Sequence, residues 1–123
     1  MSMKELTKGE EAVMKQVWHL RKATVKDITA LMPEPRPAYT TVATVLKVLK
    51  DKGFIDAEAN GNSYAYFPLI KEEEYRRFAF DKVFNTYFNS SYENLVSFLV
   101  EEKQIDDASY QRLLEAAKKL KKK

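Results

Sequence analysis

One segment, residues 37–53 (PAYTTVATVLKVLKDKG), constrains the fold of this chain more than any other. Read as a helix, it places four apolar side chains at i, i+3, i+4 and i+7, which form one stripe suited to packing against a core: Val42, Val45, Leu46 and Leu49. Pro37 suits the first helical position, where its missing N–H costs little. Gly53 stands where a residue in the left-handed conformation ends a helix. The segment therefore predicts an amphipathic helix with a defined beginning and end.

A β-hairpin is predicted directly after this helix. Two strand-like runs, residues 54–59 and 63–68, flank the pair Asn60-Gly61, which is typical of a tight turn. The hairpin is thus expected to begin as soon as the helix ends.

Two further helices are predicted upstream. Thr7 with Glu10, and Thr24 with Asp27, match the spacing of a capping box, in which each side chain accepts a hydrogen bond from the other residue's backbone. The helices are expected to end near residues 21 and 32, and Leu31 is expected to face inward in the second. Helix, helix, helix and hairpin are the elements of a winged helix-turn-helix, in this order.

The remaining residues predict three helices with wide apolar faces: one over about 71–89, a second that begins at a cap within residues 90–93, and a last one capped by Asp106. Together they carry more apolar surface than one small subunit can bury, and a symmetric dimer would cover it. The residues expected at the dimer interface are Phe80, Val83, Phe84, Tyr87, Leu95, Leu99, Leu113 and Leu114. We therefore predict a mainly α-helical fold with a small hairpin, divided into a winged-helix DNA-binding domain (1–70) and a helical dimerisation domain (71–123).

Composition excludes several classes of function. The 123 residues include no cysteine and one histidine, His19, so a thiolate metal site and a histidine-rich metal site are excluded. No Gly-rich phosphate loop and no nucleophile beside a base is found, so we expect neither an enzyme nor a cofactor. No apolar run is long enough to span a bilayer and the first residues form no apolar signal segment, so a cytoplasmic protein without membrane insertion is expected.

The net charge of +3 does not by itself indicate nucleic-acid binding. Residues 118–123 contain five lysines, and without them the chain is net negative. Lysines at the end of a helix favour the helix dipole and are usually solvated. The argument for DNA binding therefore rests on where the charges lie.

The polar face of the third predicted helix is the main candidate for DNA contact. It carries Thr40, Thr41, Thr44 and Lys47, whereas a merely solvated face usually collects Glu, Lys and Gln, which are better helix formers. Threonine offers a methyl group to thymine and a hydroxyl to phosphates or base edges. Tyr39 either reaches a phosphate or packs into the core, and Arg36 is either a phosphate contact or a solvated loop residue.

The hairpin is a weaker candidate. Between residues 53 and 70 it has no Lys or Arg, and it carries Asp56 and Glu58. A purely structural hairpin is favoured over one that touches phosphate. The missing charge also favours an alternative function, a winged-helix protein-interaction module without sequence-specific DNA binding.

The order of motifs along the chain resembles the penicillinase repressor family, the transcriptional repressors of bacterial β-lactamase and methicillin-resistance operons. The resemblance extends from about residue 6 into the last helix. It is carried by Leu6-Thr7, Val17-Trp18, Ala23-Thr24-Val25, Tyr39-Thr40-Thr41-Val42, Lys52-Gly53-Phe54-Ile55, Pro68-Leu69, Leu95-Val96-Ser97-Phe98-Leu99 and Ile105-Asp106-Asp107.

The resemblance implies a homodimeric repressor that binds a palindromic operator with Thr40, Thr41, Thr44 and Lys47. It also implies inactivation by proteolysis, initiated by a membrane-bound sensor metalloprotease that responds to β-lactams. The family is cut between asparagine and phenylalanine, and the matching bond here is Ser97-Phe98. This chain has Ala43 where family members often carry a basic residue, and it lacks the cysteine-rich end of the copper-responsive branch.

Overall fold

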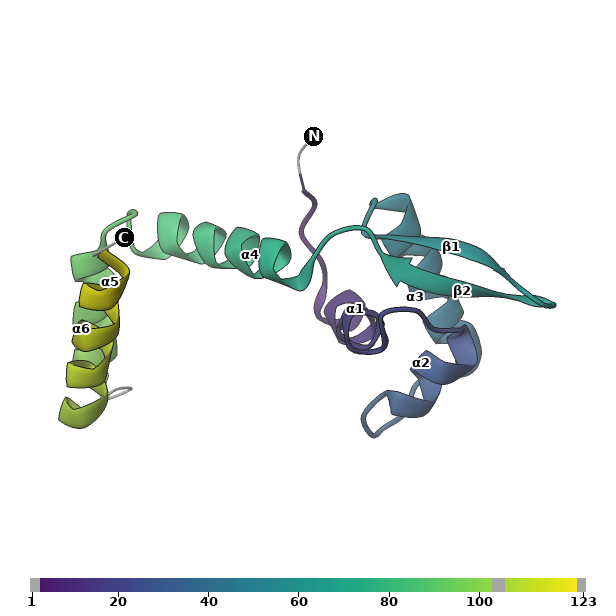
Figure 1. Cartoon of the computed structure of the whole chain (residues 1–123), viewed down its shortest axis with the longest axis horizontal. Helices are drawn as coiled ribbons and strands as arrows, with labels where there is room; N and C mark the ends of the chain where they lie inside the picture. The colour runs from purple at the N-terminus through teal and green to yellow at the C-terminus, as the bar shows by residue number, and fades with distance from the viewer. Residues whose placement is uncertain (1–2, 103–105, 122–123) are drawn as a thin grey trace. The chain divides into compact units, whose positions relative to one another are not determined.

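A computed structural model describes residues 3–102 and 106–121, and in these residues the chain forms six helices and one two-stranded hairpin (Figure 1). The chain divides into two compact units, residues 1–79 and 80–123. None of the helices in the described ranges combines the length and apolar character that a membrane span requires.

Helix α1 (Lys8–Leu20) begins with the predicted capping box. The Glu10 amide donates to the Thr7 hydroxyl at 3.2 Å, and the Thr7 amide donates to the Glu10 carboxylate at 3.0 Å. Leu6, which precedes the cap, is buried with the inward face of the helix. The prediction for the start of this helix is confirmed.

Helix α2 (Val25–Leu31) has the second predicted capping box, between Thr24 and Asp27. The prediction that Leu31 faces inward is wrong, because its side chain is 45% exposed. The helix ends at Leu31, and the next residue, Met32, has extended backbone angles. Met32, and not Leu31, is buried in the core beside Val25 and Ile28.

Helix α3 (Tyr39–Asp51) begins two residues later than predicted. Ala38 is its N-cap, with extended backbone angles, so Pro37 lies before the helix and not at its first position. The predicted end is confirmed: Lys52 is the C-cap and Gly53 follows with a φ of 84°, a conformation that glycine adopts without steric cost. The inward stripe of α3 is anchored by Val42, Leu46 and Leu49, which are fully buried.

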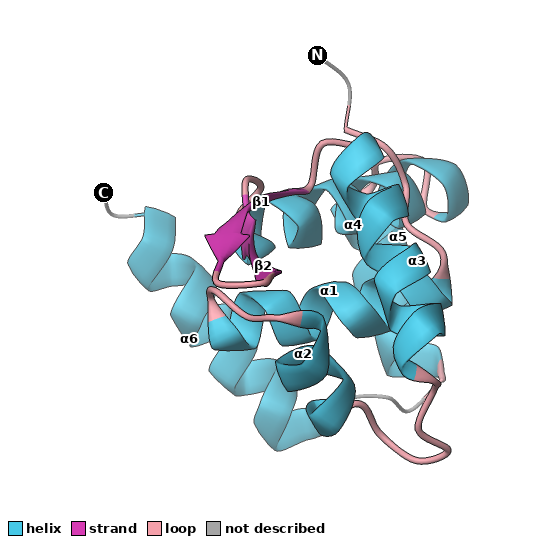
Figure 2. Cartoon of the chain, turned by 90° about the vertical axis from the view of Figure 1, so that its right-hand side faces the viewer, coloured by secondary structure: helices cyan, strands magenta, loops and turns pink. Residues whose placement is uncertain are grey.

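Strands β1 (Ile55–Asn60) and β2 (Ser63–Pro68) form the predicted antiparallel hairpin, coloured magenta in Figure 2. Asn60 pairs with Ser63, so the two-residue loop is Gly61-Asn62, one position later than predicted. Gly61 has a φ of 63°, as expected for the first central residue of a type II′ turn. The hairpin projects past α3 (Figure 1).

The base of the hairpin is tied to the connection between α1 and α2. Ala23 and Tyr66 exchange two backbone hydrogen bonds, of 3.0 and 2.7 Å. Ala23 itself is buried. This bridge fixes where the hairpin leaves the helical core.

The first unit also includes the beginning of helix α4 (Glu72–Tyr87). Tyr75 is buried, and its ring lies against Phe54 (ring centroids 5.5 Å apart) and Trp18 (6.0 Å). Its hydroxyl accepts a hydrogen bond from the Leu6 amide at 3.1 Å and donates to Glu11 at 3.0 Å. The first turns of α4 are therefore part of the first unit, residues 1–79, which we call the winged unit. The predicted domain boundary lies before this helix.

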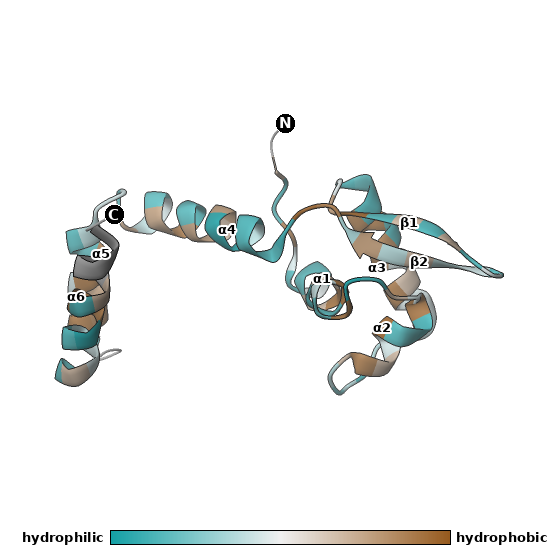
Figure 3. Ribbon diagram, viewed as in Figure 1, coloured by the Kyte–Doolittle hydropathy of each residue, from teal (hydrophilic) through white to brown (hydrophobic). Residues whose placement is uncertain are grey.

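The second unit contains the rest of α4, helix α5 (Tyr92–Glu101) and helix α6 (Asp107–Lys121). Ser91 caps α5, and the Asp106 carboxylate accepts a hydrogen bond from the Ser109 amide at 2.7 Å. Among the described side chains of this unit, Phe84 alone is buried, with 7% exposed. Apolar residues recur along α5 and α6 (brown in Figure 3), and none of the side chains of these helices whose burial is described is buried in the single chain.

Candidate nucleic-acid interface

All six residues that the sequence predicts to contact DNA have exposed side chains. They belong to α3 and to the connection that leads into it: Arg36, Tyr39, Thr40, Thr41, Thr44 and Lys47. The opposite face of α3 is anchored in the core, so the helix presents this polar surface on a fixed support.

Thr40, Thr44 and Lys47 lie at i, i+4 and i+7 and therefore share one face of α3. The Thr44 hydroxyl donates a hydrogen bond to the Thr40 carbonyl at 2.9 Å. While this bond is kept, the Thr44 oxygen can only accept. It could then read an amino group of adenine or cytosine, and its methyl group could contact thymine.

Tyr39 does not pack into the core, since 54% of its side chain is exposed. It lies at the first position of α3 and lines a groove. The Arg36 Nε donates to the Met32 carbonyl across 3.5 Å, a long bond that leaves the guanidinium exposed. Both side chains are therefore accessible to a phosphate.

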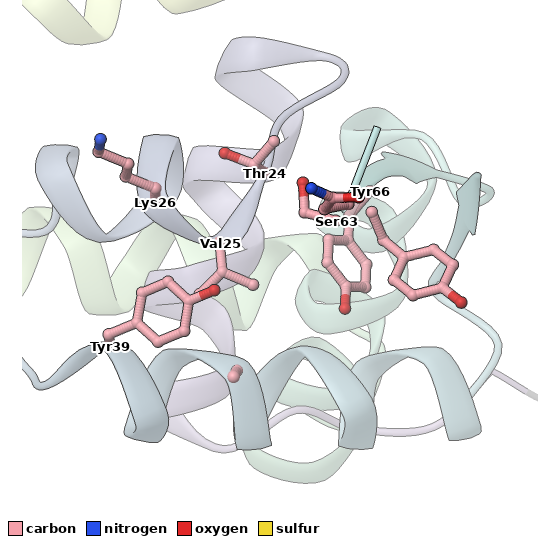
Figure 4. A pocket seen from close by; sticks show the side chains of 9 residues that line it. Thr24, Val25, Lys26, Tyr39, Ser63 and Tyr66 are labelled. Carbon is pink, nitrogen blue, oxygen red and sulfur yellow. The ribbon is translucent and has the colours of Figure 1, made fainter. Parts of the chain in front are cut away.

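An open groove of about 610 Å³ lies between α2, α3 and the hairpin. Figure 4 shows Val25 and Tyr39 on one side of it and Ser63 and Tyr66 on the other. The groove is also lined by Lys26, Tyr64 and Tyr66, which are not among the residues that the sequence predicts to contact DNA. In the sequence, these residues are marked only by being a lysine and two tyrosines. Their spacing indicates nothing, because α2 and the hairpin meet at α3 only in the folded chain.

The acidic groups of the hairpin are partly compensated by neighbours. Glu58 forms an ion pair with Lys22 at 2.9 Å, and the Asp56 carboxylate accepts a hydrogen bond from the Ala57 amide at 2.8 Å. Lys22 precedes α2, so a cation from another element lies against the hairpin. The hairpin is thus less repulsive to DNA than its own composition indicates.

A second ion pair holds the end of α3. Lys52 lies 2.6 Å from the Glu10 carboxylate and also donates to the Glu5 carbonyl at 3.2 Å. The hydrogen bond from Lys52, followed by that from the Thr7 amide, lowers the pKa of Glu10 below its ordinary value. This contact joins the start of α1 to the end of the helix that carries the candidate interface.

The predicted dimer residues lie in the second unit, and the structure of the single chain exposes most of them. Phe80, Val83, Tyr87, Leu113 and Leu114 are exposed, and Leu95 and Leu99 are half-buried. Phe84 differs, because its ring is covered within its own chain by Phe80 (5.3 Å between ring centroids) and Tyr92 (4.7 Å). Ser97 and Phe98, the predicted cleavage position, are exposed on α5.

The described ranges bring no three His, Asp or Glu side chains together in a way that could hold a metal ion. The interface instead offers hydroxyls, amides and lysines, which are groups that bind phosphates and base edges.

Three helices followed by a hairpin, with an exposed polar face on the third helix, define the winged-helix class. The solution structure of the DNA-binding domain of the repressor BlaI superposes on this chain with a TM-score of 0.53. The two sequences are 23% identical, and the matched region covers 60% of this chain and 92% of the BlaI domain. This likeness confirms the predicted winged-helix fold.

The profile of the penicillinase repressor family matches residues 6–119. The methicillin resistance regulatory protein MecI of Mammaliicoccus sciuri is 25% identical over 110 residues, which are 89% of each chain. The chain therefore belongs to the penicillinase repressor family, and the predicted resemblance is confirmed. Membership of a family of repressors also confirms that the chain is not an enzyme.

Proposed function

We propose that this protein is a transcriptional repressor that binds a two-fold symmetric operator as a homodimer. The general class, a DNA-binding transcriptional repressor, follows from membership of the family. The observation that carries the proposal is the exposed face of α3, on which Thr40, Thr44 and Lys47 lie in line above a buried stripe.

A homodimer is supported by the second unit. Its described apolar side chains are mostly exposed, and none of the residues of α5 is buried in the single chain. Exposed apolar surface of this extent is costly in water, and a second copy of the same chain would cover it. Two copies related by a two-fold axis would present two α3 helices, so the operator would consist of two inverted half-sites.

Selection from a library of random duplexes tests this function without knowledge of the operator. We expect the full-length protein to enrich two inverted half-sites whose centres are separated by about one helical turn or a multiple of it. Enrichment of no sequence, or of a single unpaired half-site, would contradict the proposal. A protein-interaction module predicts no enrichment and no steep dependence of duplex binding on salt.

Inactivation by proteolysis at Ser97-Phe98 is part of the proposal. The bond lies inside α5, and a helical bond is cut only when the helix opens locally. The Phe98 ring contacts that of Phe88, at 5.4 Å between centroids, and no residue of α5 is buried in the single chain. Cleavage there would remove α6 and part of the apolar surface that supports the dimer.

A cellular experiment tests the proteolytic step. In a host that carries the cognate sensor metalloprotease, a β-lactam should produce an amino-terminal fragment that ends at Ser97, together with derepression. Derepression while the protein stays intact would contradict cleavage as the switch and would leave the DNA-binding proposal standing.

A further inference from the structure

The segment that leads into α4 is bonded to the winged unit on two sides. The Leu69 amide donates to the Phe54 carbonyl at 2.8 Å, and the indole N–H of Trp18 donates to the Ile70 carbonyl, also at 2.8 Å. Phe54 is fully buried and lies just after the end of α3, and Trp18 belongs to α1. The path of the chain is therefore fixed immediately before α4 begins.

Tyr75 fixes the first turn of α4 itself. Its buried ring contacts those of Phe54 and Trp18. Its hydroxyl accepts a hydrogen bond from the Leu6 amide and donates one to Glu11, so the first turn is also held by residues before and within α1. We call Trp18, Phe54 and Tyr75, with these hydrogen bonds, the α4 anchor.

Two backbone hydrogen bonds join the α4 anchor to α3. The Phe54 amide donates to the Leu49 carbonyl on α3 at 3.0 Å, and the Phe54 carbonyl is the acceptor for the Leu69 amide. Leu49 belongs to the buried stripe that fixes the polar face of α3. The direction in which α4 begins is therefore set relative to the helix that carries the candidate interface.

Helix α4 continues past the end of the winged unit. It extends from Glu72 to Tyr87, whereas the winged unit ends at residue 79. It contains no Pro or Gly, residues at which sharp helix kinks often occur. In the proposed homodimer the contacts between the two copies lie in the second unit, so α4 is the connection through which they constrain each α3.

We infer that the α4 anchor makes the dimer selective for the spacing of the two half-sites, with Trp18 and Tyr75 as positioning residues that act through α4. This inference rests on the proposed function and adds a requirement for one separation. An inserted base pair moves a half-site by about 3.4 Å and rotates it by about 35°. A dimer whose anchor is intact must strain or break the anchor to follow, whereas a dimer with a loosened anchor follows more easily.

The ratio of affinities for two duplexes measures this selectivity. One duplex has the spacing obtained from the selection, and the other has one base pair inserted between the same half-sites. A loss of folded protein cancels in the ratio, so a merely structural role of Tyr75 would leave the ratio unchanged. In the full-length protein, Tyr75→Phe should lower the ratio about five-fold, because one hydrogen bond no longer has to break at the wrong spacing.

Trp18→Phe is the second variant, because it removes the donor to the Ile70 carbonyl, and it should lower the ratio to a similar extent. Glu10→Gln is the matched control. It removes an ion pair within the same unit, and none of the hydrogen bonds of the α4 anchor involves Glu10. Its ratio should equal that of the parent.

A third duplex with a single half-site separates the inference from the proposed function. If the parent binds this duplex as tightly as the duplex with the selected spacing, the proposed function fails and the inference fails with it. If the parent requires two half-sites but binds both spacings equally, the inference alone is wrong. The inference is also wrong if the parent prefers the selected spacing and both Tyr75→Phe and Trp18→Phe keep the parental ratio.

Discussion

Replacing Tyr75 by Phe should destabilise the winged unit by removing one oxygen atom. The Tyr75 hydroxyl accepts a hydrogen bond from the Leu6 amide at 3.1 Å and donates one to Glu11 at 3.0 Å. The ring contacts with Phe54 and Trp18 do not involve this oxygen and should survive. The change therefore isolates the polar link between the start of α4 and the segment that precedes α1.

The size of this destabilisation depends on how much each hydrogen-bond partner of the Tyr75 hydroxyl, Leu6 and Glu11, loses. Leu6 is buried, so its amide would be left without an acceptor, which costs about 1–3 kcal/mol. Glu11 is half-buried and recovers a hydrogen bond from water, so it should contribute little. We expect the free energy of unfolding to fall by about 2 kcal/mol.

Fluorescence of Trp18, the single tryptophan, is the assay, because its ring lies 6.0 Å from that of Tyr75 and reports on the winged unit. Urea unfolding of the full-length protein is compared with that of the control Tyr64→Phe, whose ring is exposed. The control should stay within about 0.5 kcal/mol of the parent. Equal midpoints for the parent, Tyr75→Phe and the control would refute the reasoning.

Titration of Tyr75 should make the free energy of unfolding depend on pH in the alkaline range. Burial raises the pKa of Tyr75 above its ordinary value of 10.0. A group whose pKa is raised by folding stabilises the protein below its unfolded pKa, and this stabilisation is lost as the pH rises through the folded value. The parent should therefore lose its advantage over Tyr75→Phe as the pH rises above about 10, and an advantage that persists there would contradict the assignment.

Three further changes test other parts of the structure. Glu10→Gln keeps a capping side chain but removes the ion pair with Lys52, so it should destabilise the winged unit by about 1 kcal/mol at pH 7. Because folding lowers the pKa of Glu10 from 4.5, this difference should vanish as the pH falls through the folded value, and an equal difference at pH 7 and pH 3 would contradict it. Leu113→Glu, at a position that is 54% exposed, should give monomers by light scattering, whereas the exposed control Gln111→Glu should stay dimeric; a dimeric Leu113→Glu would exclude this interface. Thr44→Ala should cost about 1–3 kcal/mol on a selected duplex and little on random DNA, and an equal loss on both would exclude base reading.

Local signals in the sequence predicted the beginnings of helices well. The two capping boxes involve residues three positions apart, so their hydrogen bonds form wherever the helix forms. Gly53 likewise ends α3 through its own backbone angle. The exposure of Leu31 could not be predicted in this way, because it depends on which of two adjacent apolar residues packs into the core, and in the folded chain Met32 does so.

The same distinction between local and long-range signals applies to the candidate interface. The exposed residues of α3 follow from helical periodicity, because the buried stripe of Val42, Leu46 and Leu49 fixes the opposite face. Lys26 and Tyr64 reach the groove from α2 and β2, and no spacing in the sequence indicates that those elements meet there. Periodicity places Phe84 on the apolar face predicted for the dimer interface, but it cannot show that the rings of Phe80 and Tyr92 cover Phe84 within its own chain.

The salt dependence of duplex binding by Lys47→Ala tests the central claim most directly, because it depends both on α3 contacting DNA and on two copies doing so. Lys47 is exposed on α3 in line with Thr40 and Thr44. If each subunit of a dimer places Lys47 on one phosphate, the slope of log K against log salt should fall in magnitude by about 2 relative to the parent. A fall of about 1 would indicate that a single α3 contacts the duplex, and an unchanged slope would show that this face of α3 does not bind DNA.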